Sequence, residues 1–220
     1  MSVRSPFFEY IYPRIKKLIE DKIYADKLDF NGEIYTWDDF KFSLKGNNYC
    51  VYQTESLNLL HKLTPAYIQF LNKAKYVFDY SELNIPYYPR AIYLPLKIEK
   101  IPPKNNVLNK EILFYGYISD RRKNIIELLK NNSFLVKTID GCFGDNLYNT
   151  LSKYQYVLSY GTYDNVSNDS FRIIPAIENG CIVLTERTQE KSFDEYLLKK
   201  CSDRIIFFEE TTIIDDLMQK

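Results

Sequence analysis

The residues best suited to chemistry lie in the segment NDSFRIIPAIENGCIVLTE, positions 168–186. Positions 168–170 can cap a helix, and Asn179-Gly180 is a typical helix end. The amino end of such a helix presents free backbone N–H groups and the positive end of the helix dipole, which suits a diphosphate. Arg172 adds a cation with two parallel donors. Glu178, at the other end, can accept hydrogen bonds from neutral hydroxyls such as those of a sugar.

Further polar residues follow strand-like runs, and ligands of open parallel sheets bind at the carboxyl ends of strands. The residues at these ends are Tyr115-Gly116-Tyr117, Asp140-Gly141, Tyr160-Gly161-Thr162-Tyr163 and Thr185-Glu186. Gly116 permits a sharp turn and leaves room for a ligand. Arg121, Arg122 and Lys123 begin the next helix, where a phosphate would offset their repulsion by the helix dipole. The alternative is a solvated surface patch. Neither G-x-G-x-x-G nor a P-loop sequence is present.

Two carboxylates follow strand-like runs in the amino-terminal half. Glu55 comes after NYCVYQ, and Asp79 ends KYVFD. A carboxylate at such an edge can act as a general base. Glu55 is the first candidate, Asp79 the second and the single histidine, His61, the third. The alternative for Glu55 is that it only caps a helix beginning near Ser56.

From residue 111 onward, strand-like and helix-like runs alternate regularly. The expected strands are 111–116, 134–140, 155–161, 181–186 and 204–209, and the expected helices are 119–131, 144–154, 170–179, 192–201 and a short last one from Thr211 or Thr212. This spacing predicts parallel βαβ units. The strands are almost entirely apolar, as in a sheet covered on both faces. Pro175 is expected near the first turn of its helix or at a kink.

The first 96 residues are less regular. The expected strands are 33–37, 48–53, 75–80 and 90–96, and the expected helices are 8–20, 56–61, 65–73 and 81–87. Residues 97–110 are rich in Pro, Lys and Asn and are predicted to be a linker. We therefore expect an α/β protein with a reduced domain at 1–96, a linker at 97–110 and a regular Rossmann-like domain at 111–220, with a cleft between the domains.

Composition excludes several classes of protein. The 220 residues include 29 basic and 29 acidic side chains without a basic stripe, so no nucleic-acid partner is expected. No apolar run approaches the roughly 20 residues of a membrane span, and the amino terminus lacks a signal-peptide core. A soluble cytoplasmic protein is expected. The four cysteines form no C-x-x-C pair and there is one histidine, so no metal site is expected.

Three segments together, FYGYISDRRKNII, LYNTLSKYQYVLSYG and SFRIIPAIENGCIVLTE, resemble the carboxyl-terminal domain of GT-B glycosyltransferases of the "group 1" and spore-maturation-like kind. The resemblance covers about residues 111–208 and implies two Rossmann-like domains, the second of which binds a nucleotide sugar. It places Gly116 and Arg121 or Arg122 by the diphosphate, and Glu178 by the ribose or sugar. With the strand-end rule, the expected donor-binding residues are Gly116, Arg121, Arg122, Tyr160, Ser170, Phe171, Arg172 and Glu178.

The resemblance implies a hexosyl- or pentosyltransferase that moves a sugar from a nucleotide sugar to a hydroxyl of a carbohydrate or glycoconjugate, without a metal or cofactor. Retaining members often carry Glu-x7-Glu, whereas Ser170 stands eight residues before Glu178 here. The amino-terminal half resembles the acceptor half of such enzymes more weakly, and it is short. The alternatives are an inactive nucleotide-sugar-binding or regulatory module of the same fold, and a sugar-nucleotide epimerase.

Overall fold

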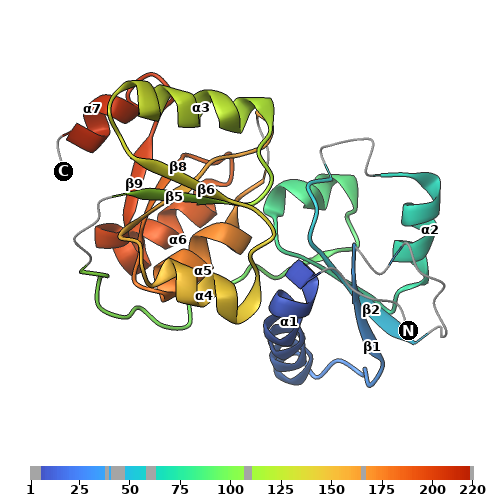
Figure 1. The fold of residues 1–220 in the computed structure, drawn as a ribbon. Helices are drawn as coiled ribbons and strands as arrows, with labels where there is room; N and C mark the ends of the chain where they lie inside the picture. The colour runs from blue at the N-terminus through green and yellow to red at the C-terminus, as the bar shows by residue number, and fades with distance from the viewer. Residues whose placement is uncertain are drawn as a thin grey trace. The chain divides into compact units, whose positions relative to one another are not determined.

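The computed structural model describes residues 6–37, 40, 48–57, 63–106, 111–164 and 167–218. The chain forms two compact units, Met1–Leu96 and Lys97–Lys220, and each contains one parallel sheet (Figure 1). Most of the helix expected at 56–61, including His61, lies outside the described residues. No helix in the described ranges is long and apolar enough to cross a membrane.

The first unit is a four-stranded parallel sheet in the order β1-β2-β3-β4. Its elements are α1 (Pro6–Ala25), β1 (Glu33–Thr36), β2 (Tyr49–Gln53), α2 (Pro65–Lys73), β3 (Tyr76–Asp79), the 3-10 helix η3 (Glu82–Tyr87) and β4 (Ile92–Tyr93). Gln53 pairs with Asp79 in the register of β2 and β3. The carboxyl ends of these two strands therefore lie side by side.

Both faces of β2 are buried, because its alternate side chains point to opposite sides. Tyr49 and Val51 belong to an aromatic core with Tyr67 and Phe70 of α2. Tyr52, on the other face, lies close enough to Arg14 of α1 to be influenced by its charge. The segment expected as a helix at 81–87 is a 3-10 helix with Pro86 inside it. A proline there lacks the N–H that a regular helix would use.

The second unit is a five-stranded parallel sheet in the order β6-β5-β7-β8-β9. Its elements are β5 (Ile112–Tyr115), α3 (Asp120–Asn131), β6 (Val136–Ile139), α4 (Gly144–Leu151), β7 (Tyr156–Ser159), α5 (Ser170–Glu178), β8 (Ile182–Glu186), α6 (Lys191–Cys201), the 3-10 helix η4 (Ser202–Arg204), β9 (Ile205–Phe208) and α7 (Ile213–Met218). The predicted alternation of strands and helices is confirmed. The strand order reverses between β5 and β7, and such a switch point is where open α/β sheets bind ligands.

Helices cover both faces of the second sheet. Figure 1 shows α3 and α7 on one face and α4, α5 and α6 on the other. Ile125 and Leu129 of α3 and Ile213 of α7 pack in one core with alternate residues of the strands, such as Phe114 and Leu158. Pro175 lies inside α5, beyond the first turn.

The described part of the predicted linker, residues 97–106, belongs to the second unit and is hydrogen-bonded to its other elements. The side-chain amide of Asn105 donates to the backbone carbonyls of Leu151, Tyr154 and Asn179 at 3.1, 2.9 and 2.9 Å. Gly180 ends α5 with a φ of +85°, and a Cβ there would lie 2.4 Å from Asn105 Oδ1. The predicted Asn-Gly helix end therefore also makes room for this segment.

Candidate functional site

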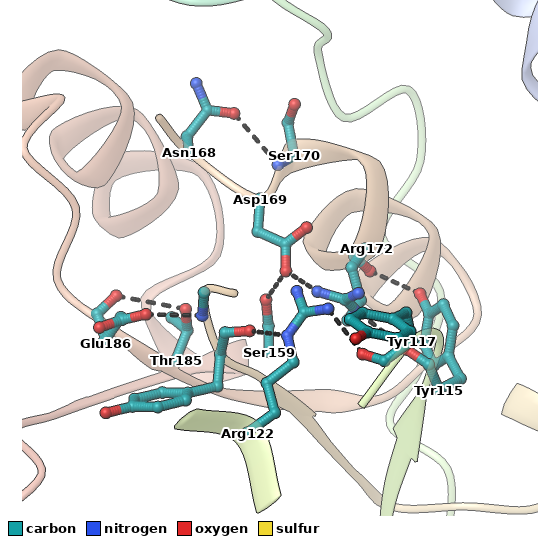
Figure 2. Close-up of polar contacts among 12 residues, drawn as sticks. Tyr115, Tyr117, Arg122, Ser159, Asn168, Asp169, Ser170, Arg172, Thr185 and Glu186 are labelled. Carbon is teal, nitrogen blue, oxygen red and sulfur yellow. Dashed lines mark hydrogen bonds and ion pairs between the residues drawn. The ribbon is translucent and has the colours of Figure 1, made fainter. Parts of the chain in front are cut away.

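The first turn of α5 is bonded directly to the end of β5 (Figure 2). Arg172 donates from Nε to the carbonyl of Tyr115 at 3.0 Å, and the Tyr115 hydroxyl donates to the carbonyl of Arg172 at 2.8 Å. Gly116 follows with a φ of +106°, and a Cβ there would lie 3.0 Å from Arg172 Nη2. Glycine therefore permits both the backbone turn and the close approach of the guanidinium.

Asp169, immediately before α5, ties this helix to the end of β7. Its carboxylate accepts a 2.6 Å hydrogen bond from the Ser159 hydroxyl and forms an ion pair with Arg172 Nη1 (Figure 2). The same carboxylate makes no capping bond to the backbone of α5. Asp169 therefore balances the charge of Arg172, the cation predicted to bind phosphate, and does not cap the helix with its side chain.

The residues on either side of Asp169 carry unsatisfied polar groups. Asn168 Oδ1 accepts from the Ser170 N–H at 3.1 Å. The amide nitrogen Nδ2 of Asn168 and the hydroxyl oxygen Oγ of Ser170 are buried and have no hydrogen-bond partner within the described ranges. The two residues are only 4% and 1% exposed. A buried polar group without a partner costs about 1–3 kcal/mol, so this helix end has hydrogen-bonding capacity that a ligand or water can use.

Arg122 links the loops that follow β5 and β7 across the switch point. It donates from Nε to the carbonyl of Tyr160 at 2.6 Å and from Nη1 to the carbonyl of Tyr117 at 2.8 Å (Figure 2). Burial, assisted by the charge of Arg172, lowers the pKa of Arg122 to about 10. The buried side chain of Arg122 therefore connects the loops that follow β5 and β7.

Arg121 is held by two carboxylates. Its guanidinium donates two parallel hydrogen bonds to Glu186, at 2.9 and 2.7 Å, and its Nε contacts Asp164 at 2.7 Å. The guanidinium also lies 3.9 Å from the ring centre of Tyr160. Burial opposes the charge, but the hydrogen bonds and charge of Glu186 raise the pKa of Arg121 above its ordinary value.

A cavity of about 410 Å³ lies at the carboxyl ends of β7 and β8. Its walls include Arg121, Ser159, Gly161, Asp169, Thr185 and Glu186, together with Tyr163-Asp164, Ser167 and Arg187–Gln189 from the adjoining loops. All of these residues belong to the second unit. The cavity is polar and lies where ligands of this kind of sheet bind.

The structure brings some of the predicted donor-binding residues together and separates others. Gly116, Ser170 and Arg172 cluster at the start of α5, and Arg121 lines the cavity. Phe171 is half-buried in the first turn of α5. Tyr160 is buried, and its hydroxyl donates to Glu210 at 2.8 Å.

Glu178 lies at the opposite end of α5. Its Oε1 accepts a hydrogen bond from the backbone N–H of Glu99 at 2.6 Å, and the residue is 6% exposed. It is not among the residues that line the cavity. Its assignment to the ribose or sugar stays a prediction.

Sequence reasoning missed the residues that hold the arginines. Asp169 appeared only as one of three possible caps, and Glu186 only as a strand-end residue. Ser159 and Asp164 were not singled out, and neither was Arg187, which lines the cavity. The position of Glu186 at the end of a buried strand was the available signal, but its partner Arg121 stands 65 positions earlier in the chain.

The two predicted catalytic carboxylates are in the first unit. Asp79 is buried, and its Oδ1 accepts from the Ser81 N–H and from Asn84 Nδ2, both at 2.9 Å. Asn84 also donates to the backbone carbonyl of Glu55 at 2.9 Å and accepts from the Leu57 N–H at 2.7 Å. Asp79 thus orients Asn84, and Asn84 fixes the loop that carries the half-buried Glu55.

Across the described ranges, no group of three or more His, Cys, Asp or Glu side chains could hold a metal ion. That the protein works without a metal stays a prediction.

No family model matches the chain, and no curated protein matches it. The chain is similar to a solved structure described as an alpha-glucosyltransferase in complex with UDP and a 13-mer DNA containing a HMU base. The TM-score is 0.50 at 11% sequence identity, and the match covers 80% of this chain and 63% of that one. At this identity the likeness concerns the fold alone. The chain has a Rossmann-like, two-domain α/β fold of the kind found in that glucosyltransferase.

Proposed function

We propose that this protein is a GT-B-type glycosyltransferase whose second unit binds a nucleotide sugar and transfers the sugar to an acceptor hydroxyl. The fold likeness supports the class of protein, because the similar structure is a glucosyltransferase bound to UDP. The sequence resemblance over residues 111–208 supports the same class independently.

The observation that carries the proposal is the amino end of α5. Ser170 Oγ and Asn168 Nδ2 are buried there without partners in the described part of the chain, beside Arg172 and Gly116 at the switch point. Backbone N–H groups, a hydroxyl, an amide and a guanidinium are all donors that phosphate oxygens accept. The diphosphate of a nucleotide sugar would satisfy them.

The ion pairs at the site determine how the arginines act in this proposal. Arg172 is balanced by Asp169, and Arg121 by Glu186 and Asp164. These arginines are therefore held in place before a ligand arrives, so little ordering is needed on binding. Charge on the departing nucleoside diphosphate would be stabilised by Arg172 and the start of α5, without a metal.

For the acceptor, Glu55 is the proposed general base. This role rests on its position after β2 and on the Asn84 bonds that fix its loop. The alternative, a module of the same fold that binds nucleotide sugars without turnover, predicts binding but no transfer. Release of nucleoside diphosphate from a nucleotide sugar, measured with a panel of saccharide acceptors, separates these two.

The binding site is tested by Ser170→Ala. Removing a buried hydroxyl that lacks a partner should leave the free protein as stable as the wild type or slightly more so. The same change should weaken nucleoside-diphosphate binding by about 0.5–1.5 kcal/mol, the contribution of one hydrogen bond. Binding is measured by calorimetry with the tightest of UDP, GDP, ADP and dTDP, first identified by thermal shift.

Ser192→Ala, at an exposed position in α6, is the matched control. Ser192→Ala should change neither the stability of the free protein nor its affinity for the nucleoside diphosphate. Wild-type protein that binds none of these nucleotides would refute the proposed function, and normal affinity in Ser170→Ala would remove Ser170 from the site.

A further inference from the structure

Arg187 follows β8 directly and lines the cavity. Its guanidinium carbon lies 4.6 Å from the ring centre of Phe207 in β9. Within the described ranges, Arg187 has no hydrogen bond or ion pair. Stacking on an aromatic ring fixes the plane of a guanidinium and leaves its N–H edges available.

The other arginines near the cavity differ from Arg187 in this respect. Arg121 gives two parallel bonds to Glu186, and Arg172 is paired with Asp169. Their charges are balanced by groups of the protein itself. Burial raises the pKa of Asp194, and Arg187 is near enough for its charge to oppose that rise. Arg187 forms no such paired bonds within the described ranges, so its N–H groups can reach an anion in the cavity.

The loop that carries Arg187 is hydrogen-bonded to the start of α6. Asp194 accepts from the Thr188 N–H at 3.1 Å and from the Thr188 hydroxyl at 3.0 Å. The buried Glu190 accepts from the Asn168 N–H at 2.8 Å, which ties the loop to the residues preceding α5. Arg187 is thus positioned in advance, beside the proposed diphosphate-binding end of α5.

We propose that Arg187 contacts a phosphate group of the ligand in this cavity, as a residue of the donor site in addition to the start of α5. This inference rests on the proposed function, since it takes the ligand to be a nucleoside diphosphate. The planar guanidinium suits two oxygens of one phosphate. The nucleoside part of the ligand does not use this contact.

The test compares UDP with uridine in calorimetric titrations of the full-length protein. Arg187→Gln should weaken UDP binding about 10- to 100-fold, the range for a lost hydrogen bond to a charged group, and leave uridine binding unchanged. Arg187→Lys keeps the charge without the paired donors, so its UDP affinity should lie between those of the wild type and Arg187→Gln. Lys199→Gln, an exposed residue of α6, removes the same charge and should have no effect.

The outcomes separate this inference from the proposed function. UDP affinity that is unchanged in a folded Arg187→Gln protein overturns the role of Arg187 and leaves the nucleotide site intact. Equal weakening of UDP and uridine also overturns it, because the loss would not then involve phosphate. If wild-type protein binds none of UDP, GDP, ADP and dTDP, the proposed function fails, and this inference fails with it.

Discussion

Arg121 and Glu186 face each other through two parallel hydrogen bonds, Nη1 to Oε1 at 2.9 Å and Nη2 to Oε2 at 2.7 Å. Glu186 Oε1 also accepts from the Gly161 N–H at 2.6 Å. An arginine expected to meet a diphosphate therefore forms part of the cavity wall. This pair joins the start of α3 to the end of β8 across the loop that follows β7.

Glu186→Gln should lower the free energy of unfolding by about 1–2 kcal/mol. Glutamine keeps one acceptor and loses the charge, so half of the paired contact with Arg121 is lost in a partly exposed setting. Urea denaturation measures the change. Glu209→Gln, an exposed residue in the same unit, serves as control, and equal stability of the two variants would contradict the role of this pair.

Gly116→Ala should be more destabilising than Gly141→Ala. Both glycines have positive φ, +106° and +65°, so both substitutions strain the backbone. A Cβ at 116 also meets Arg172 Nη2 at 3.0 Å, whereas a Cβ at 141 meets nothing within 4 Å. The two losses of unfolding free energy, measured by urea denaturation, should differ by about 1 kcal/mol or more. Equal losses would mean that the guanidinium moves aside without cost.

Cysteine reactivity should distinguish Cys142 from the other three thiols. Burial raises the pKa of Cys50 and of Cys181 to about 12 and that of Cys201 to about 11. Cys142 is only partly buried. At pH 8, a disulfide reagent should titrate one thiol quickly in the native protein, and Cys142→Ser should abolish that phase. Rapid reaction of two or more thiols would contradict the burial of Cys50, Cys181 and Cys201.

The same thiols make stability depend on alkaline pH. In the unfolded chain they ionise near their ordinary pKa of about 9, whereas the folded protein keeps them protonated up to about 11 or 12. Their contribution is therefore complete below pH 9 and falls as the pH rises through 9 toward 12. Cys181→Ala should reduce this slope in denaturation curves measured over that range.

Much of the second sheet could be predicted from sequence, because local signals and the fold agree there. Ser119 caps α3 by accepting from the Arg122 N–H at 3.4 Å, and Gly180 ends α5 as expected. The partners of the arginines could not be predicted in this way. Arg121 and Glu186 are 65 residues apart, and Glu178 and Glu99 are 79 apart, so only the folded chain shows that they meet.

Glu55→Gln should lower turnover about 10²–10⁴-fold and leave nucleoside-diphosphate affinity unchanged, as expected for loss of a general base. Asp79→Asn should retain most turnover, because the remaining oxygen can still accept from Ser81 and Asn84. Steady-state kinetics with an identified acceptor measures both. Near-normal turnover in Glu55→Gln with a large loss in Asp79→Asn would make Asp79 the base.

The proposed site for the nucleoside diphosphate comprises the start of α5 and the cavity beside it. The most direct measurement is a titration of ¹⁵N-labelled protein with UDP, followed through the backbone amide signals. We expect saturable shifts at Gly161, which lines the cavity, and at Gly116 and Ser170 around the start of α5, with no comparable shift at Gly141, which belongs to neither place. Saturable shifts confined to other parts of the chain would contradict this site.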